Sequence, residues 1–283
     1  MFPSEVGKMK KRDSKKIFNK ILSDIKSVKI QGARNIAKAA LYAYSINPGK
    51  ISVKKLVSSR PTEPMLVNVL RKAEKQPYEK VLNHFDEAQK KINENVLKII
   101  NDGDVIFTHC HSTNVVNALI YAKKMGKKFQ VYNTETRPLF QGRKTANDLR
   151  KAGIKVTMFI DSALGIALEK ENPNDEIYSN KVFIGADALL NSGIINKIGS
   201  GLIAKIAKLE KIPVCIIADS WKYSSKKIQI EQRNLNEIWN KAPNGIKIKN
   251  PAFEFVPKRY ISKIISELGT LNYDDFLKKI KLQ

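Results

Sequence analysis

Residues 105–219 contain five short apolar runs, VIFTH (105–109), FQVYNTE (129–135), KVTMFID (155–161), KVFIGAD (181–187) and PVCIIAD (213–219). Helix-length stretches such as residues 115–124 and 146–152 lie between them. Continuous apolar runs are typical of strands buried on both faces of a sheet, and their alternation with helices indicates parallel pairing. The sequence therefore predicts an α/β fold with a doubly wound parallel sheet.

The first hundred residues follow a different pattern. Apolar residues recur at three- and four-residue steps over residues 13–41 and 78–100, which predicts helices. Asn47-Pro48-Gly49 and the pair Pro61 and Pro64 mark turns between them. We expect a helical domain over 1–100 and a sheet domain over 101–283, with later helices over 258–268 and 273–280.

Composition limits the class of protein. The chain has 283 residues, of which 42% are hydrophobic, enough for large buried cores. It has neither the roughly 20 uninterrupted apolar residues of a membrane helix nor the apolar centre of a signal peptide, so we expect no membrane association and a cytoplasmic location. The two cysteines, Cys110 and Cys215, are expected to be thiols.

Positive charge gathers at the front of the chain. The formal net charge is +24, and residues 1–60 hold 15 Lys and Arg against 3 Asp and Glu. Such an excess suits nucleic acid or an anionic metabolite, and it can also reflect Lys-rich coding. Because the sequence has no RNA-binding sheet signature, zinc-finger spacing or basic zipper, it argues against nucleic acid as the main partner.

Each apolar run is followed by a residue that could be reactive: Cys110, Glu135, Asp161, Asp187 and Asp219. The carboxyl ends of parallel strands meet at one edge of a sheet, where ligands bind. We therefore expect a thiol and four carboxylates at one rim. The alternative is that they are ordinary turn and cap residues, above all Asp161.

Cys110 stands between His109 and His111. Strand alternation would place both histidines on one face and the thiol on the other, which disfavours a metal site. A thiol at a strand end near positive charge can act as a base or nucleophile once its pKa is lowered. The alternative is a buried structural cysteine, the interpretation we give to Cys215.

A glycine-rich stretch, NSGIINKIGSG (191–201), leads into an apolar helix and contains Lys197. Backbone N–H groups at a helix start can bind phosphate, and a lysine adds charge. A tight turn without a ligand fits the spacing equally well.

Eight motifs in order carry a resemblance to a known family. They are DIKSVKIQGARNIAKAAL (24–41), SSRPTEPML (58–66), THCHS (108–112), TETRPLFQG (134–142), DSA (161–163), GADALLNSGIINKIGS (185–200), ADSWKY (218–223) and NPAFEFVP (250–257). Together they resemble the archaeal ribose-1,5-bisphosphate isomerase and translation initiation factor 2B family. The resemblance implies a helical N-terminal domain and a Rossmann-like C-terminal domain.

The resemblance also implies a site. Cys110 and Asp187 match the catalytic pair of the isomerase branches. The residues expected to hold a phosphorylated pentose are Gln31, Gly32, Ala33, Arg34, Arg60, Ser112, Thr113, Asn114, Arg137, Asn196, Lys197 and Lys222. Where we expect Arg-Gly-Ala-Gly in the family, this chain has Gln31-Gly32-Ala33-Arg34, which puts one phosphate contact in question.

Three functions fit the resemblance. The first is isomerisation of ribose 1,5-bisphosphate to ribulose 1,5-bisphosphate in nucleoside monophosphate salvage, with Asp187 as acid, Cys110 as base and neither metal nor organic cofactor. The second is a non-enzymatic regulatory subunit that binds a sugar phosphate or nucleotide. The third is methylthioribose-1-phosphate isomerisation. A homo-oligomer, dimer or hexamer, and activation by AMP are also expected.

Overall fold

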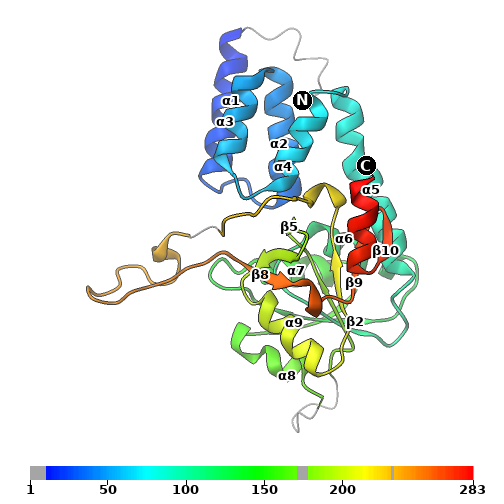
Figure 1. Ribbon diagram of the computed structural model, residues 1–283. Helices are drawn as coiled ribbons and strands as arrows, with labels where there is room; N and C mark the ends of the chain where they lie inside the picture. The colour runs from blue at the N-terminus through cyan, green and yellow to red at the C-terminus, as the bar shows by residue number, and fades with distance from the viewer. Residues whose placement is uncertain (1–10, 171–177, 231–232, 283) are drawn as a thin grey trace.

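The computed structural model describes residues 11–170, 178–230 and 233–282. Helices of the N-terminal part stand on one end of a layered α/β body (Figure 1). The N-terminal helices are α1 (Lys11–Lys26), α2 (Ala33–Ile46), α3 (Lys50–Ser59), α4 (Pro64–Ala73) and α5 (Tyr78–Leu97). The α/β class expected from the sequence is confirmed.

Seven strands form the main sheet, in the order β10-β9-β7-β4-β1-β2-β3. They are β1 (Val105–Thr108), β2 (Gln130–Thr134), β3 (Lys155–Phe159), β4 (Lys181–Ile184), β7 (Val214–Ile217), β9 (Lys263–Ser266) and β10 (Gly269–Leu271). All pairs are parallel except β9 with β10. From β1 the chain winds outward to β2 and β3 and then returns to β4 on the other side, so the strand order reverses between β1 and β4. Ligand sites of doubly wound sheets lie at such a reversal.

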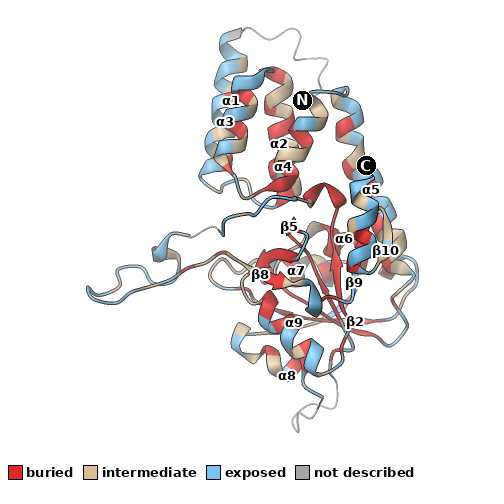
Figure 2. Cartoon of the chain, in the orientation of Figure 1, coloured by how far each residue is buried: buried red, intermediate tan, exposed pale blue. Residues whose placement is uncertain are grey.

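Helices cover both faces of this sheet (Figure 2). On one face α5, α6 (Thr113–Lys124) and α7 (Gln141–Lys151) pack on inward side chains such as Ile106 and Val131. On the other face α8 (Leu164–Leu168), α9 (Ser200–Leu209) and α10 (Tyr273–Lys281) pack on Phe107 and Val182. Because both faces of each central strand are buried, the strands are apolar throughout.

A small antiparallel sheet lies beside the main one. It is built from β5 (Ala188–Leu189), β6 (Gly193–Lys197) and β8 (Phe253–Pro257), in the order β5-β6-β8. Four 3₁₀ turns complete the described chain: η2 (Asp161–Ala163), η3 (Ser220–Lys222), η4 (Leu235–Glu237) and η5 (Lys258–Tyr260). The small sheet carries Asn196 and Lys197 toward the reversal point.

Two predicted helices are wrong. The helix expected over residues 13–41 is two helices, because Val28 (φ 61°) and Gly32 (φ 84°) take left-handed conformations that end α1 and start α2. The helix expected over 258–268 is instead η5 and β9. Ile264 packs on one face of the sheet and Ile265 on the other, so pairing with β7 overrides the local helical spacing.

The helix expected over 78–100 is confirmed as α5, and the one over 273–280 as α10. α5 packs through Phe85 on α2 and α4, and through Ile92 and Val96 on the sheet side. A division into separate domains near residue 100 stays a prediction. Within the described residues, no helix combines the length and apolarity that crossing a bilayer requires.

Candidate functional site

A cavity of about 540 Å³ opens at the reversal point of the sheet. The segments that follow β1 and β4, with β6 and the starts of α2 and α6, form its walls. Of the lining residues that the structure describes, seven are Lys or Arg and three are Asp or Glu, which makes this wall positively charged. Its volume lies in the usual range for small-molecule sites, and its charge selects an anion.

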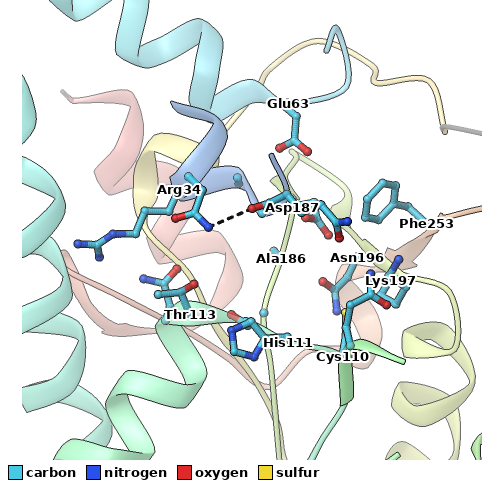
Figure 3. Close-up of a pocket in the computed structure, with 18 of the residues that line it drawn as sticks. Arg34, Glu63, Cys110, His111, Thr113, Ala186, Asp187, Asn196, Lys197 and Phe253 are labelled. Carbon is cyan, nitrogen blue, oxygen red and sulfur yellow. Dashed lines mark hydrogen bonds between the residues drawn. The ribbon is translucent and has the colours of Figure 1, made fainter. Parts of the chain in front are cut away.

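Most of the predicted site residues line this cavity. They are Gln31, Gly32, Ala33, Arg34, Arg60, Cys110, Ser112, Thr113, Asn114, Asp187, Asn196, Lys197 and Lys222. Figure 3 shows Cys110 beside Asn196 and Lys197, with Arg34 on the opposite side. Arg137 is the exception: it is exposed, its guanidinium lies 5.0 Å from the ring centre of Phe140, and it does not line the cavity.

Cys110 is held in an unusual backbone conformation. Strand β1 ends at Thr108. Cys110 has a φ of 63°, a left-handed conformation that is unfavourable for any residue with a Cβ. Its N–H donates to Thr136 Oγ1 (3.0 Å), and its carbonyl accepts from Thr145 Oγ1 (2.8 Å). Because the strand has ended, alternation does not apply, and His109, Cys110 and His111 all reach the cavity wall.

The two histidines brace this turn. His109 Nε2–H donates to Ile198 O (2.8 Å), while Nδ1 lies 2.6 Å from Thr134 Oγ1. Burial lowers the pKa of His109, so its imidazole ring is neutral and connects the Cys110 segment with the Lys197 segment. His111 Nδ1 lies 3.0 Å from Thr145 Oγ1, and burial followed by the Lys144 charge lowers its pKa to about 4.

The predicted lowering of the Cys110 pKa is wrong. Burial raises the pKa of this thiol to about 11, and the nearby Lys197 charge opposes the rise without cancelling it. The Asp187 charge acts in the same direction as burial, which places this carboxylate in the electrostatic environment of the thiol. Cys110 is therefore a protonated thiol at neutral pH.

Alkylation should reveal this thiol. In a Cys215→Ala variant, where Cys110 is the remaining cysteine, we expect iodoacetamide to react slowly at pH 7.5. The rate should rise about tenfold per pH unit toward a pKa near 11, because the thiolate is the reactive form. A plateau below pH 9, measured by mass spectrometry, would contradict the raised pKa.

Two buried lysines contribute to the cavity's positive charge. Lys197 is 8% and Lys222 7% exposed. Lys222 Nζ donates to Ala186 O (2.7 Å), and Lys197 Nζ lies 5.0 Å from the ring centre of Phe253. Among the described residues, neither ammonium group has a carboxylate within ion-pair distance. Since a buried charge is costly unless an opposite charge neutralises it, the cavity is prepared for an anionic ligand.

The glycine-rich turn before α9 binds an internal anion. Gly199 N–H and Gly201 N–H both donate to Glu254 Oε1 (2.6 and 2.9 Å). The start of α9 thus already binds a carboxylate, which favours the second interpretation of this stretch, a tight turn without a ligand. The contribution of the turn is to hold Lys197 and Asn196, whose Nδ2 donates to Ser200 Oγ (2.8 Å).

The start of α6 forms another wall. Ser112 Oγ caps the helix by accepting from Val115 N–H (3.5 Å), and Asn114 Nδ2 donates to Gln89 Oε1 on α5 (2.9 Å). A Cβ at Gly185, after β4, would lie 2.5 Å from Ser112 Oγ. Glycine there lets the β4 end approach α6, which brings Asp187 toward the Cys110 side of the cavity.

Three of the predicted rim carboxylates lie outside the cavity. Glu135 pairs with Arg143 (2.8 Å). Asp161 accepts from the N–H groups of Thr136 and Arg137 (2.8 and 2.6 Å), and so holds the loop that contacts Cys110. Asp161 therefore stabilises the conformation of this loop.

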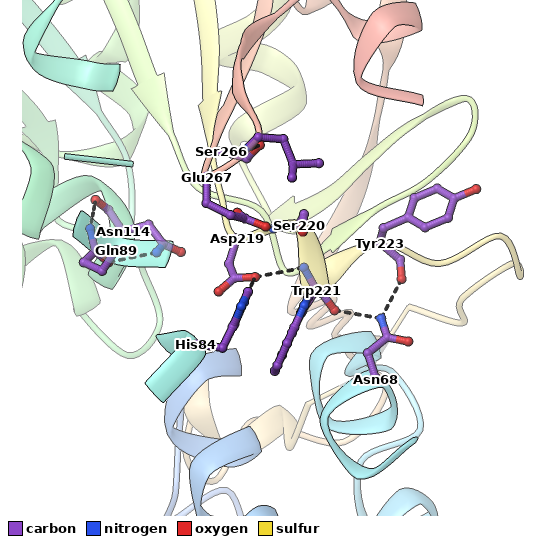
Figure 4. Close-up of polar contacts among 11 residues, drawn as sticks. Asn68, His84, Gln89, Asn114, Asp219, Ser220, Trp221, Tyr223, Ser266 and Glu267 are labelled. Carbon is purple, nitrogen blue, oxygen red and sulfur yellow. Dashed lines mark hydrogen bonds and ion pairs between the residues drawn. The ribbon is translucent and has the colours of Figure 1, made fainter. Parts of the chain in front are cut away.

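Asp219 joins the sheet to the N-terminal helices (Figure 4). Its Oδ1 lies 3.2 Å from His84 Nε2 on α5, and the His84 ring stacks on Trp221 at 3.4 Å. Asn68 on α4 donates to the carbonyls of Trp221 and Tyr223 (2.8 and 2.9 Å), which fixes the backbone on both sides of Lys222. Ligand atoms of His84, Asp219 and Glu267 lie within 4.8 Å of one another, outside the cavity, and are the group best placed for a metal ion in the described chain.

Some cavity residues were not predicted. They are Lys29, Glu63, His109, His111, Lys144, Asp148, Arg233 and Phe253, among others. Glu63 and Phe253 lie inside the quoted motifs SSRPTEPML and NPAFEFVP, which was the available signal. Arg233 lies 123 residues after Cys110 in sequence, and only folding brings it to the cavity wall.

Comparison with known proteins agrees with the geometry. The sequence model of the Initiation factor 2 subunit family matches residues 50–273. A ribose 1,5-bisphosphate isomerase from Methanocaldococcus jannaschii is 34% identical over 94% of each chain, and one from Archaeoglobus fulgidus is 32% identical over 87% of each. A solved structure of the translation initiation factor eIF-2B from Pyrococcus horikoshii superposes with TM-score 0.79 at 25% identity, over 90% of this chain and 96% of that one. The match extends over both the helical part and the sheet, so this chain belongs to the initiation factor 2 subunit family.

Proposed function

We propose that the protein is a sugar-phosphate isomerase that converts ribose 1,5-bisphosphate into ribulose 1,5-bisphosphate. The observation that carries the proposal is the pair of buried lysines, Lys197 and Lys222, in one cavity with Cys110 and Asp187. Relatives that bear this enzyme name and align over most of both chains support it.

The chemistry requires an acid and a base. The C1 phosphate blocks spontaneous ring opening, so Asp187 as a carboxylic acid gives a proton to the ring oxygen as its bond to C1 breaks. The Cys110 thiolate removes the proton from C2, and the electrons form the C1–C2 double bond of an enol phosphate. The thiol then returns a proton to C1 while the Asp187 carboxylate takes the proton of the C2 hydroxyl, which leaves the ketone.

One proton shared between the two side chains starts this cycle. The raised pKa of Cys110 keeps that proton on the thiol. Moving it to the Asp187 carboxylate creates both the base and the acid without changing the charge of the cavity. Lys197 stabilises the thiolate, because its charge already lowers the pKa of Cys110 against the effect of burial.

Phosphorus NMR tests the proposal directly. Purified protein is incubated with ribose 1,5-bisphosphate, with and without AMP. The Cys110→Ser variant, which should be inactive, serves as the control. Formation of ribulose 1,5-bisphosphate by the wild type alone is the expected result. A folded wild type that forms no product under either condition would reject the proposal.

Thr136→Val tests the positioning of the thiol. The change keeps the side-chain volume but leaves the Cys110 N–H without its 3.0 Å acceptor. We expect kcat to fall about tenfold, equivalent to about 1.4 kcal/mol of barrier, with KM nearly unchanged. Thr108→Val, which removes a buried hydroxyl from β1, is the control and should retain kcat. Equal losses in both variants would contradict the positioning role.

A regulatory subunit is the second candidate. The favouring observation is the 0.79 TM-score to a structure titled as a translation initiation factor. A regulator needs a ligand pocket but no use of the Cys110 thiol, so ligand binding without turnover in the NMR experiment would favour it. Methylthioribose-1-phosphate isomerisation is tested in the same assay with that substrate. Oligomer size and AMP activation stay predictions.

A further inference from the structure

Arg34 occupies the position at which this chain departs from the expected glycine. It lies in the first turn of α2 and lines the cavity. Its guanidinium nevertheless points away from Asp187 (Figure 3), and its Nη2 lies 2.5 Å from Asp86 Oδ1 on α5. The cation expected to bind a phosphate is therefore paired with a carboxylate of the same chain.

The start of α2 beside Arg34 differs from the starts of α6 and α9. Its N-cap is Gly32, which has no side chain with which to cap the helix. By contrast, Glu254 neutralises the start of α9, and Ser112 caps α6. Gln31, Gly32 and Ala33 line the cavity, so an anion held at this helix start would lie next to Arg34.

The contact between Arg34 and Asp86 is weak enough to exchange. The Asp86 side chain is 78% exposed, and exposed ion pairs shift an equilibrium by only about 1.4-fold to fivefold. A guanidinium bound to phosphate in an enclosed site contributes about tenfold to a hundredfold. Arg34 should therefore bind phosphate in preference to Asp86.

Asp86 would not be left without a cation after the exchange. Lys38 Nζ lies 3.8 Å from the same Asp86 oxygen, and 5.2 Å from the ring centre of Phe85. Burial and the Arg34 charge lower the pKa of Lys38 while Asp86 raises it. Departure of Arg34 removes a like charge from Lys38 and leaves it Asp86 as partner, which favours the exchange.

We propose that Asp86 is an internal competitor for the second phosphate of a bisphosphate substrate, and that Arg34 leaves Asp86 for this phosphate when the substrate binds. The inference rests on the proposed function for the identity of the ligand. It names Arg34 as the residue that selects a bisphosphate over a monophosphate, and Asp86 as the residue that sets the strength of that selection.

Binding to an inactive background tests the inference without turnover. In Cys110→Ser protein, isothermal titration calorimetry measures the Kd of ribulose 1,5-bisphosphate. Arg34→Ala should weaken binding about tenfold or more, and Asp86→Asn should tighten it about twofold to fivefold. Binding of ribose 5-phosphate, a monophosphate, should change much less in both variants.

Two controls separate competition from a general charge effect. Glu87→Gln removes the same charge one residue later on α5, at another exposed position, and should leave the Kd unchanged. Asp86→Asn added to Arg34→Ala should not change the Kd further, because the arginine with which Asp86 pairs is then absent.

The inference is overturned if Asp86→Asn behaves as Glu87→Gln does, if it tightens binding equally without Arg34, or if the bisphosphate does not bind. Failure of the isomerase proposal looks different. If the variants show the expected changes in Kd but the wild type forms no ribulose 1,5-bisphosphate, the exchange of Arg34 is supported and only the proposed reaction is rejected.

Discussion

Replacing Cys110 by serine is expected to lower kcat by at least about a thousandfold, within the range that general base catalysis contributes. The serine hydroxyl keeps the size and can keep the backbone contacts to Thr136 and Thr145, but it ionises far less readily than the thiol. Steady-state formation of ribulose 1,5-bisphosphate measures the loss. The Kd for this product should stay within about threefold of wild type, since the residues proposed to bind the phosphates are unchanged.

Matched variants make the result specific. Cys215→Ser changes the other thiol, which is buried in the sheet core, and it should lower the melting temperature while retaining kcat per folded molecule. If Cys110→Ser turned over within tenfold of wild type, the thiol would not be the base.

Asp187→Asn is expected to lower kcat by a factor between about a hundred and ten thousand. The amide has the shape of the carboxyl group but cannot supply the proton that the ring oxygen needs. Asp148→Asn is the control: Asp148 also lines the cavity, but its carboxylate pairs with Lys144 at 2.6 Å, and kcat should stay within about threefold.

The double variant adds a sharper test. Because the acid and the base act in one proton cycle, Cys110→Ser combined with Asp187→Asn should be about as slow as the slower single variant. Losses that multiply would show that the two side chains act in independent steps and would contradict the shared proton.

The order of the strands explains why Cys110 and Asp187 line the same cavity. Cys110 follows β1 and Asp187 follows β4, and these neighbouring strands flank the point at which the strand order reverses. The 76 residues between them wind through β2 and β3 before the chain returns. Either residue alone reads as an ordinary strand-end residue.

Several features follow from the sequence alone. The five apolar runs are all strands. Four of them, β1, β2, β4 and β7, are buried almost throughout, and a segment buried on both faces must be apolar along its length; β3, at the edge of the sheet, is only partly buried. Thirteen of the site residues that the ordered motifs predict line one cavity. Those that follow β1 and β4 lie where parallel strands end, whereas residues 31–34 and Arg60 come from the N-terminal helices. Local spacing failed at Ile264 and Ile265, where the partner strand β7 determined the structure.

Only the tertiary structure decided the electrostatics. The sequence places cations around Cys110 and predicts a lowered pKa, yet burial outweighs Lys197 and raises it. Glu254 removes the α9 start from phosphate binding, and Asp86 holds Arg34 away from Asp187, although both acids are distant in sequence from the groups that they contact. Apolar periodicity is a property of neighbouring residues and can be read along the chain. Desolvation and charge pairing depend on which distant side chains share a volume, and only the folded protein determines that.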